Sequence, residues 1–149
     1  MVEIATSTAS KEGGSPFLVV ATYLPLRSYA NVISFVRPSG RIEAQLRASK
    51  GAIRYALLTD IPHKRFWTVS VWSGDEAMSL FSRSEPHRTA MKKFYEWGTA
   101  EAGIAEWSSN GGTIDWDEAE TKLREPAFRF RLEGNRLVQA AGSRSVAGD

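Results

Sequence analysis

Apolar positions follow two different periods along this chain, alternating in some segments and recurring every three or four residues in others. The first period is typical of strands and the second of helices. The predicted strands are residues 16–26, 53–60, 65–72, 102–109 and 128–132, and the predicted helices are residues 27–49, 73–85, 86–97 and 115–125. The last strand alternates on its own and is predicted to be an edge or exchanged strand.

Capping and helix-breaking residues refine the predicted helices. Ser28 is suited to cap the first helix, which Pro38 and Gly40 interrupt, so residues 27–49 form one broken helix or two short ones. Ser73 and Glu76 have the spacing of a capping box, which predicts that the next helix begins at Ser73.

The order of these elements is β-α-β-β-α-β, which predicts an α+β fold of the ferredoxin-like type. In this fold the helices cover one face of the antiparallel sheet. The other face must be buried in some other way if it is apolar. The first strand, PFLVVATYLPL, is apolar on both alternating sets, as in a strand that is buried on both faces. A homodimer with two sheets packed face to face, a dimeric α/β barrel, provides that cover. The alternative is an α+β domain that covers the sheet with its own tails.

The length of 149 residues suits one domain, which we expect at residues 16–134 between flexible polar tails at 1–15 and 135–149. No apolar run reaches the roughly 18 residues that a membrane span needs, and the first residues lack the order of a secretory signal. The chain has no cysteine, which fits a cytoplasmic location, and its net charge of +2 does not indicate nucleic-acid binding.

His87 directly follows Pro86, where the helix restarts, and is the first candidate for chemistry. Met91 and Phe94 recur at i+4 and i+7 from it, so the imidazole and both candidate lining residues share an inward apolar face. Burial lowers the pKa of an imidazole and leaves a neutral base or a ligand for haem iron. The alternative is a core histidine that bonds a backbone carbonyl near Pro86.

The predicted strand 65–72 has two unlike faces. One face is purely apolar and suits packing against helices; it carries Trp67, Val69 and Val71. The other mixes aromatic and hydroxyl side chains; it carries Phe66, Thr68, Ser70 and Trp72. Such a mixture is typical of a small-molecule pocket and also of a dimer interface, and both can hold in a barrel between two sheets.

Arg54 is the second catalytic candidate, because an arginine within a strand needs a carboxylate partner or access of its charged end to water. It could hold a substrate carboxylate, or it could form a structural pair with Glu106. Three further aromatic side chains are candidates to line the same pocket: Tyr23, Tyr55 and Trp107. His63 lies in the hairpin loop and is predicted to be exposed, and its spacing from Asp60 matches no strong metal-binding pattern.

Residues 66–94, FWTVSVWSGDEAMSLFSRSEPHRTAMKKF, resemble the central segment of the dimeric α/β-barrel superfamily that includes antibiotic-biosynthesis monooxygenases. The likeness is nearest to small domains of unknown function related to spheroidene monooxygenase. The matching residues are Ser70, Trp72, Asp75, Glu76, Phe81 and His87, within a likeness that covers about residues 17–110. The resemblance implies a homodimer and, through spheroidene monooxygenase, haem. The superfamily also holds cofactor-free oxygenases, isomerases, decarboxylases and proteins without known activity.

These observations favour a monooxygenase-like enzyme that acts on a hydrophobic small molecule, aromatic or polyene, in a barrel pocket. His87 is either the base that deprotonates the substrate, with no cofactor, or the axial ligand of haem. Two alternatives stay open. One is an oxygen-independent isomerase or dehydratase that uses His87 for proton transfer, and the other is a non-catalytic dimeric small-molecule-binding protein.

Overall fold

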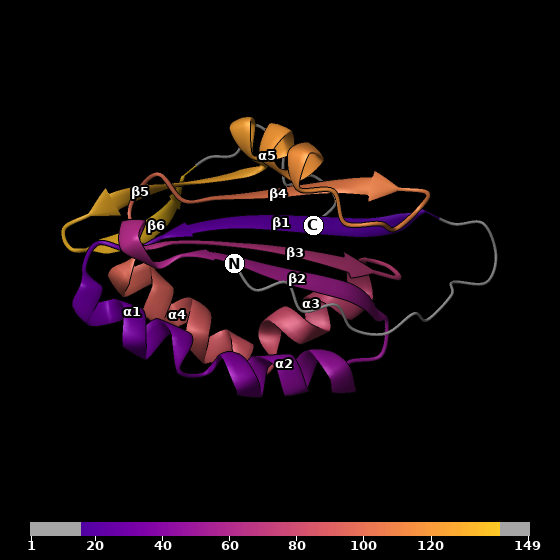
Figure 1. The fold of residues 1–149 in the computed structure, drawn as a ribbon, viewed down its shortest axis with the longest axis horizontal. Coiled ribbons are helices and arrows are strands. Elements are labelled where there is room, and N and C mark those ends of the chain that lie inside the picture. The colour runs from indigo at the N-terminus through magenta and orange to yellow at the C-terminus, as the bar shows by residue number, and fades with distance from the viewer. Residues whose placement is uncertain (1–15, 141–149) are drawn as a thin grey trace.

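The computed structural model of the protein describes residues 16–140, and the predicted tails lie outside this range apart from residues 135–140. Figure 1 shows the order of the elements. They are β1 (Phe17–Pro25), α1 (Tyr29–Val36), α2 (Ser39–Ala48), β2 (Ala52–Asp60), the 3-10 turn η1 (Ile61–His63), β3 (Arg65–Trp72), α3 (Asp75–Arg83), α4 (His87–Trp97), β4 (Gly103–Ser109), α5 (Trp116–Arg124), β5 (Phe128–Glu133) and β6 (Arg136–Ala140).

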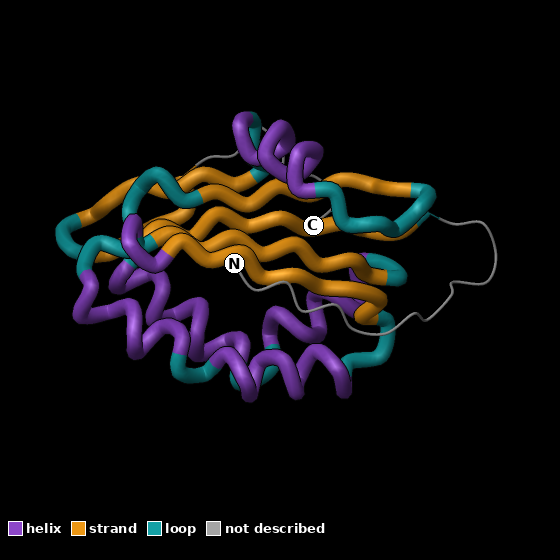
Figure 2. Tube along the Cα trace, viewed as in Figure 1, coloured by secondary structure: helices purple, strands orange, loops and turns teal. Residues whose placement is uncertain are grey.

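The strands form one antiparallel sheet in the order β2-β3-β1-β4-β5-β6. Helices α1 to α4 cover one face of this sheet, and α5 lies on the opposite face (Figures 1 and 2). The arrangement confirms the predicted α+β, ferredoxin-like fold. No helix in the described part of the chain is long and apolar enough to cross a membrane.

The helix boundaries follow local capping chemistry. The region 27–49 forms two helices, and the Ala30 amide donates to the Ser28 hydroxyl at 3.1 Å, as the sequence predicted. The predicted capping box is wrong, because α3 begins at Asp75 after Gly74, without a side-chain cap. The reason is that the Ser73 amide still donates to the Gly51 carbonyl at 2.8 Å, which holds Ser73 at the end of the hairpin.

The C-terminal part of the sheet differs from the prediction in two ways. β5 is not an edge strand, because β6 pairs with it on its other side. The chain is also regular beyond residue 134, where a flexible tail was predicted. Gly134, at a positive φ of 63°, allows the tight turn into β6, and Leu137 on β6 is only 2% exposed. Pairing with β5 and the packing of Leu137 in the core cluster together hold the last strand in place.

β1 is buried on both faces, as predicted. Val19 is 1% exposed and packs in the cluster under α5, whereas Val20 is 8% exposed and packs beneath α2 and α3. The chain therefore covers part of the second sheet face itself, through α5, and the predicted cover by the tails concerns residues that lie mostly outside the described range. The homodimer with face-to-face sheets stays a prediction.

We expect Leu137→Ala to lower the free energy of unfolding by about 2 to 5 kcal/mol, because it leaves a cavity where a buried leucine packs. Leu132→Ala is the matched control: Leu132 lies in the same hairpin but is 44% exposed, so a change within about 0.5 kcal/mol is expected. Urea unfolding of the two variants measures the difference. Equal small effects would show that β6 does not belong to the core.

Candidate functional site

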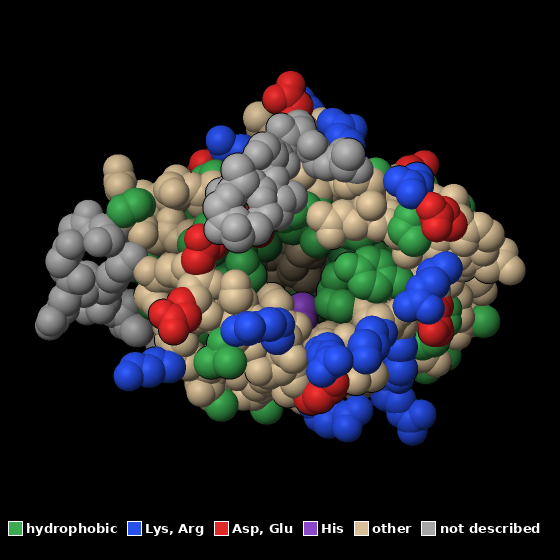
Figure 3. Space-filling view, turned by 180° about the vertical axis from the view of Figure 1, so that it is seen from behind, with side chains coloured by type: hydrophobic (Ala, Val, Ile, Leu, Met, Phe, Trp, Pro, Cys, Tyr) green, Lys and Arg blue, Asp and Glu red, His purple; other side chains and the backbone are tan. Residues whose placement is uncertain are grey.

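A pocket of about 480 Å³ lies between the sheet and the helices α1 to α4. It separates two core clusters, one built around Phe66 and Phe94 and the other around Trp72 and Phe81. Figure 3 shows the hollow from behind, with apolar side chains around it and a histidine at its margin. This volume is in the range of sites that bind small organic molecules. We call this hollow the helix-side pocket.

Side chains that lie opposite each other on neighbouring strands form the floor of the pocket. Thr68 on β3 lies opposite Thr22 on β1, and their hydroxyl oxygens are 2.5 Å apart. One row further along the same face, Ser70 accepts a hydrogen bond of 2.8 Å from the Trp72 indole nitrogen. These polar groups satisfy one another, so the floor is aromatic and hydroxyl-bearing without being charged.

His87 enters the pocket wall from the first residue of α4. Its Nδ1 atom is 3.4 Å from the Ser82 carbonyl oxygen, and its ring centroid is 4.6 Å from that of Phe81. A carbonyl only accepts hydrogen bonds, so this contact favours the tautomer with the proton on Nδ1. The Nε2 atom then keeps its lone pair and can accept a proton or bind a metal ion.

Burial lowers the pKa of the His87 imidazole below its usual value, and the contact with the Ser82 carbonyl opposes this shift more weakly. Desolvation disfavours the charged ring, whereas a carbonyl acceptor favours it. The ring is therefore neutral at pH 7. A neutral imidazole in an apolar wall is suited to take up a proton from a bound molecule.

Gln45 on α2 holds the turn that carries His87. Its side-chain nitrogen donates to the carbonyls of Phe81 at 3.1 Å and Ser84 at 3.3 Å, at the end of α3. Its side-chain oxygen accepts from the His87 amide at 3.0 Å, at the start of α4. One amide thus satisfies backbone groups of two helix ends. The position of the imidazole depends on this brace, which sequence reasoning did not predict.

Two carboxylates and one tyrosine also belong to the polar part of the lining. Glu43 on α2 pairs with Arg47 at 2.5 Å, and Glu106 lines the pocket from β4. The buried hydroxyl of Tyr55 makes no hydrogen bond within the described residues. It nevertheless raises the pKa of the exposed Arg47 guanidinium, so the two groups lie near each other without the alignment of a hydrogen bond. Of the described residues, no lysine or arginine lines this pocket.

Seven of the eleven predicted site residues line the helix-side pocket: Tyr55, Phe66, Thr68, Ser70, Trp72, His87 and Met91. Four do not. Phe94 is completely buried in the core, and Trp107 packs in the cluster under α5. Tyr23 stacks on Trp67, with ring centroids 5.3 Å apart, and lines a different pocket. The aromatic character of these residues was visible in the sequence, but their side of the sheet was not.

Arg54 is also placed outside the pocket. It pairs with Val71, whose side chain belongs to the cluster on the α5 side of the sheet. Glu106 lines the pocket on the opposite face, and β3 and β1 separate the strands that carry the two residues. The predicted pair of Arg54 with Glu106 therefore does not form. The alternation within each strand was predicted correctly, but the strand order was needed to place the two residues.

The unlike faces of β3 are oriented differently from the prediction. The mixed face with Thr68 and Ser70 lies beneath α1 to α4, and the pocket lies within one chain rather than between two sheets. The apolar face with Val69 and Val71 packs in the cluster under α5. The helices do not fill the space above the hydroxyl-bearing face, and this leaves the pocket.

Sequence reasoning missed several lining residues, including Thr22, Phe35, Tyr95 and Phe128. Thr22 carried a signal, because it is a hydroxyl residue in an otherwise apolar strand. Phe35 and Tyr95 lie on helix faces whose apolar pattern predicts ordinary core packing. Phe128 comes from β5, and only the sheet order brings that strand to the pocket.

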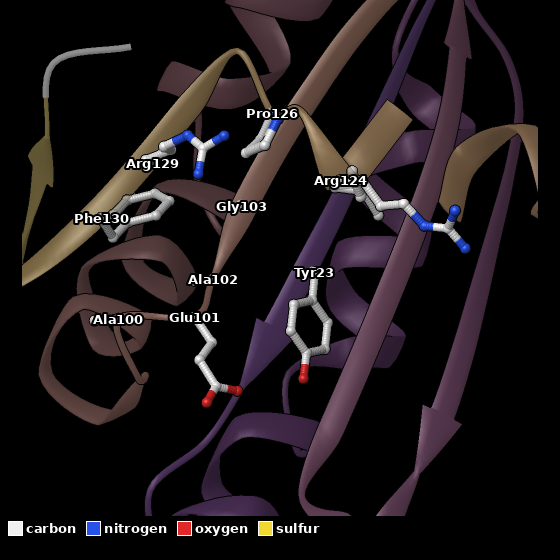
Figure 4. Close-up of a pocket in the computed structure, with 10 residues that line it drawn as sticks. Tyr23, Ala100, Glu101, Ala102, Gly103, Arg124, Pro126, Arg129 and Phe130 are labelled. Atoms are coloured by element: carbon white, nitrogen blue, oxygen red, sulfur yellow. The ribbon is translucent and has the colours of Figure 1, made fainter. Parts of the chain in front are cut away.

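A second, smaller hollow of about 240 Å³ involves Tyr23, Glu101 and Arg129 (Figure 4). Its charged side chains do not converge: the Arg124 and Arg129 guanidinium groups lie on different sides of it, and Glu101 extends away from both (Figure 4). Partial burial raises the pKa of Tyr23 above its usual value, which keeps the phenol protonated. This hollow lacks a group suited to catalysis near pH 7.

His63 lies in η1 and is exposed, as predicted. Its Nδ1 atom contacts Asp60 at 2.8 Å, and this contact lowers the pKa of the Asp60 carboxyl. The described part of the chain contains no cluster of three or more histidine and acidic residues that could hold a metal ion. The Asp60–His63 pair is therefore a surface contact that fastens the hairpin turn.

No family model matches the sequence, and no curated protein matches it either. Solved structures with the same fold do match. A proposed antibiotic biosynthesis monooxygenase from Nitrosomonas europaea is 12% identical with a TM-score of 0.57, over 71% of this chain and 100% of its own. A proposed monooxygenase from Fusobacterium nucleatum is 14% identical with a TM-score of 0.57, over 76% and 54%.

The chain has the fold of the antibiotic biosynthesis monooxygenase-like proteins. A haem-degrading enzyme from Listeria monocytogenes also shares it, at 14% identity and a TM-score of 0.57, over 72% of this chain and 69% of its own. The resemblance to this superfamily predicted from residues 66–94 is thus confirmed for the fold. The nearer likeness to spheroidene monooxygenase stays a prediction.

We expect His87 to titrate below about 6.5 in NMR spectra, with its resonances assigned by their loss in His87→Phe. Between the lowered pKa of the folded state and about 6.5, the unfolded chain binds more protons, so the free energy of unfolding rises with pH. Urea unfolding across this pH range should show that slope, and His87→Phe should remove it. A His87 pKa at or above 6.5 would contradict the proposed burial.

Gln45→Leu should raise the pKa of His87 toward its usual value, because the turn between α3 and α4 opens and water reaches the ring. Ser28→Ala is the control, since it removes a capping hydrogen bond of similar length from α1. NMR titration of His87 should show the shift only in the Gln45 variant. An equal His87 pKa in both variants would mean that Gln45 contributes to stability alone.

Proposed function

We propose that this protein is a monooxygenase-like enzyme that acts on a hydrophobic aromatic or polyene molecule bound in the helix-side pocket. One observation carries the proposal: an apolar pocket of about 480 Å³ with a neutral imidazole in its wall. The fold that the chain shares with monooxygenase-like proteins supports the same hypothesis. At sequence identities of 12% to 14%, this similarity is evidence for the fold and not for the activity.

In the proposed reaction the Nε2 atom of His87 accepts a proton from the bound substrate. The aromatic walls formed by Trp72 and Phe81, with ring centroids 5.1 Å apart, exclude water from the resulting anion. The substrate anion supplies the electrons that reduce dioxygen. For a methylene carbon between aromatic rings the balance is CH₂ + O₂ → C=O + H₂O, so one oxygen atom enters the product and the other leaves as water.

Haem fits the pocket in one respect and not in another. His87, whose Nδ1 atom contacts the Ser82 carbonyl, is the residue that would hold haem iron. The charged lining residues are Glu43 and Glu106, both acidic, whereas the two propionates of haem need cations. The described residues therefore do not fit a haem held within the pocket, and the proposal uses the cofactor-free reaction.

The oxygen-independent alternative requires the same base in the same pocket. An isomerase or dehydratase would use the neutral His87 for proton transfer, and no feature of the lining favours it over oxygenation. Consumption of dioxygen separates the two reactions. A non-catalytic binding protein would bind the same ligands without turnover.

We expect the purified protein to consume dioxygen with polycyclic phenols, measured with an oxygen electrode. His87→Gln keeps a similar side-chain size without a base, so turnover should fall by about 10² to 10⁴, while quenching of tryptophan fluorescence shows unchanged binding. Arg54→Gln is the matched control and should keep full turnover, because Arg54 lies on the other face of the sheet.

Three results would count against this assignment. Full turnover in His87→Gln would remove the histidine from the reaction. Product formed without dioxygen uptake would point to the isomerase or dehydratase. A Soret band that forms with added hemin and disappears in His87→Gln would show that haem binds through this residue.

A further inference from the structure

The outer side of helix α1 exposes large apolar side chains to solvent. Tyr29 is 58% exposed, Ile33 77% and Val36 38%. They recur at i, i+4 and i+7 and so form one stripe along the helix. The opposite side of α1 carries Val32 and Phe35, which pack against the core. The stripe is therefore additional to the apolar face that α1 needs for folding.

The turn η1 extends this stripe. The Tyr29 hydroxyl donates a hydrogen bond to the Pro62 carbonyl, which brings the start of α1 against η1. Ile61 in that turn is 43% exposed, and Lys64 places its Nζ atom 4.8 Å from the centroid of the Tyr29 ring. We call the four apolar residues the α1 patch: Tyr29, Ile33, Val36 and Ile61.

Two basic side chains, Arg37 and Lys64, flank the α1 patch. Arg37 is at i+4 from Ile33, on the side of α1 that carries the stripe. Arg37 directly follows Val36 and is exposed, and Lys64 lies over Tyr29. The patch thus combines an apolar centre with a basic rim.

We propose that the α1 patch docks the protein onto an anionic lipid bilayer. Apolar side chains of such a patch enter the boundary between headgroups and acyl chains, and the basic rim attracts anionic headgroups. Ile33, the most exposed large apolar side chain of the described residues, provides the deepest contact. Docking of this kind is peripheral and reversible, and it does not depend on the reaction proposed for the pocket.

Charge and size favour a bilayer over a second copy of the chain. In a twofold dimer through this surface each basic rim would face its own copy, and the like charges would repel. The patch is also one side of an eight-residue helix with one neighbouring turn. Stable protein interfaces bury about 800 Å² on each partner, so a dimer through this surface would have to extend well beyond the helix and the turn.

Co-sedimentation with vesicles tests the proposal on the full chain. We expect binding to vesicles of phosphatidylcholine mixed with phosphatidylserine and little binding to phosphatidylcholine alone. Added salt should weaken binding, because ions screen the attraction between the basic rim and the headgroups. Equal binding to both kinds of vesicle, or binding to neither, would overturn the proposal.

Variants assign the binding to the patch. Ile33→Ser should weaken partitioning about tenfold, and Lys64→Gln about fivefold. Leu80→Ser is the matched control: Leu80 is 61% exposed on α3, a helix that begins with Asp75 and Glu76, so binding should not change. Wild-type binding in Ile33→Ser and Lys64→Gln would overturn the assignment.

Light scattering provides the second readout. A dimer that Ile33→Ser dissociates would show that another copy of the chain covers the patch, and the bilayer proposal would fail. Thermal unfolding checks that the variants fold, and the exposure of Ile33 predicts little change. If Ile33→Ser does not fold, Lys64→Gln decides the question. None of these results bears on His87, so failure here leaves the proposed reaction open to its own test.

Discussion

Burial of β1 on both faces is the constraint on which the structure depends. Val19 and Ala21 point toward α5, while Val20 and Leu24 point toward α1 to α4, and all four are at most 8% exposed. A strand of this kind must lie inside the sheet with cover on each side. β3 and β4 accordingly flank it, and the two helical layers follow. The core is thus divided into separate clusters above and below one strand.

The helix-side pocket results from how the helix layer meets that sheet. One cluster gathers around Phe66 and Phe94, and another gathers around Trp72 and Phe81. Between them the floor carries the hydroxyl groups of Thr22 and Thr68, which bond to each other and leave no large apolar side chain to fill the gap. Packing that is dense at both ends therefore leaves an open pocket in the middle.

The turn between α3 and α4 gives this space its chemistry. His87 begins α4, and the side chain of Gln45 ties its amide to the end of α3. The imidazole is held against Phe81 in the pocket wall, and its partial burial lowers the pKa of the ring. A base placed at a helix start depends on the turn before it. The contribution of α2 to the site is therefore as important as that of the helix carrying the histidine.

Much of the fold was predictable from the sequence, because strand and helix periods are local properties. The elements from β1 to α5 lie close to their predicted positions, and seven predicted residues line the pocket. The errors concern non-local pairing. Glu106, one possible partner of Arg54, lies across two strands on the other face. The strand β6 was missed because its pairing with β5 and the burial of Leu137 are both contacts between separate elements.

The sequence by itself determined the ferredoxin-like order, the double burial of β1 and the inward face shared by His87 and Met91. These follow from alternation and helical spacing within single elements. Only the tertiary structure decided which face of β3 meets the helices, that α5 covers the other face, and that Gln45 braces the histidine. Each of these depends on contacts between distant segments, and the period of one element carries no information about its partner.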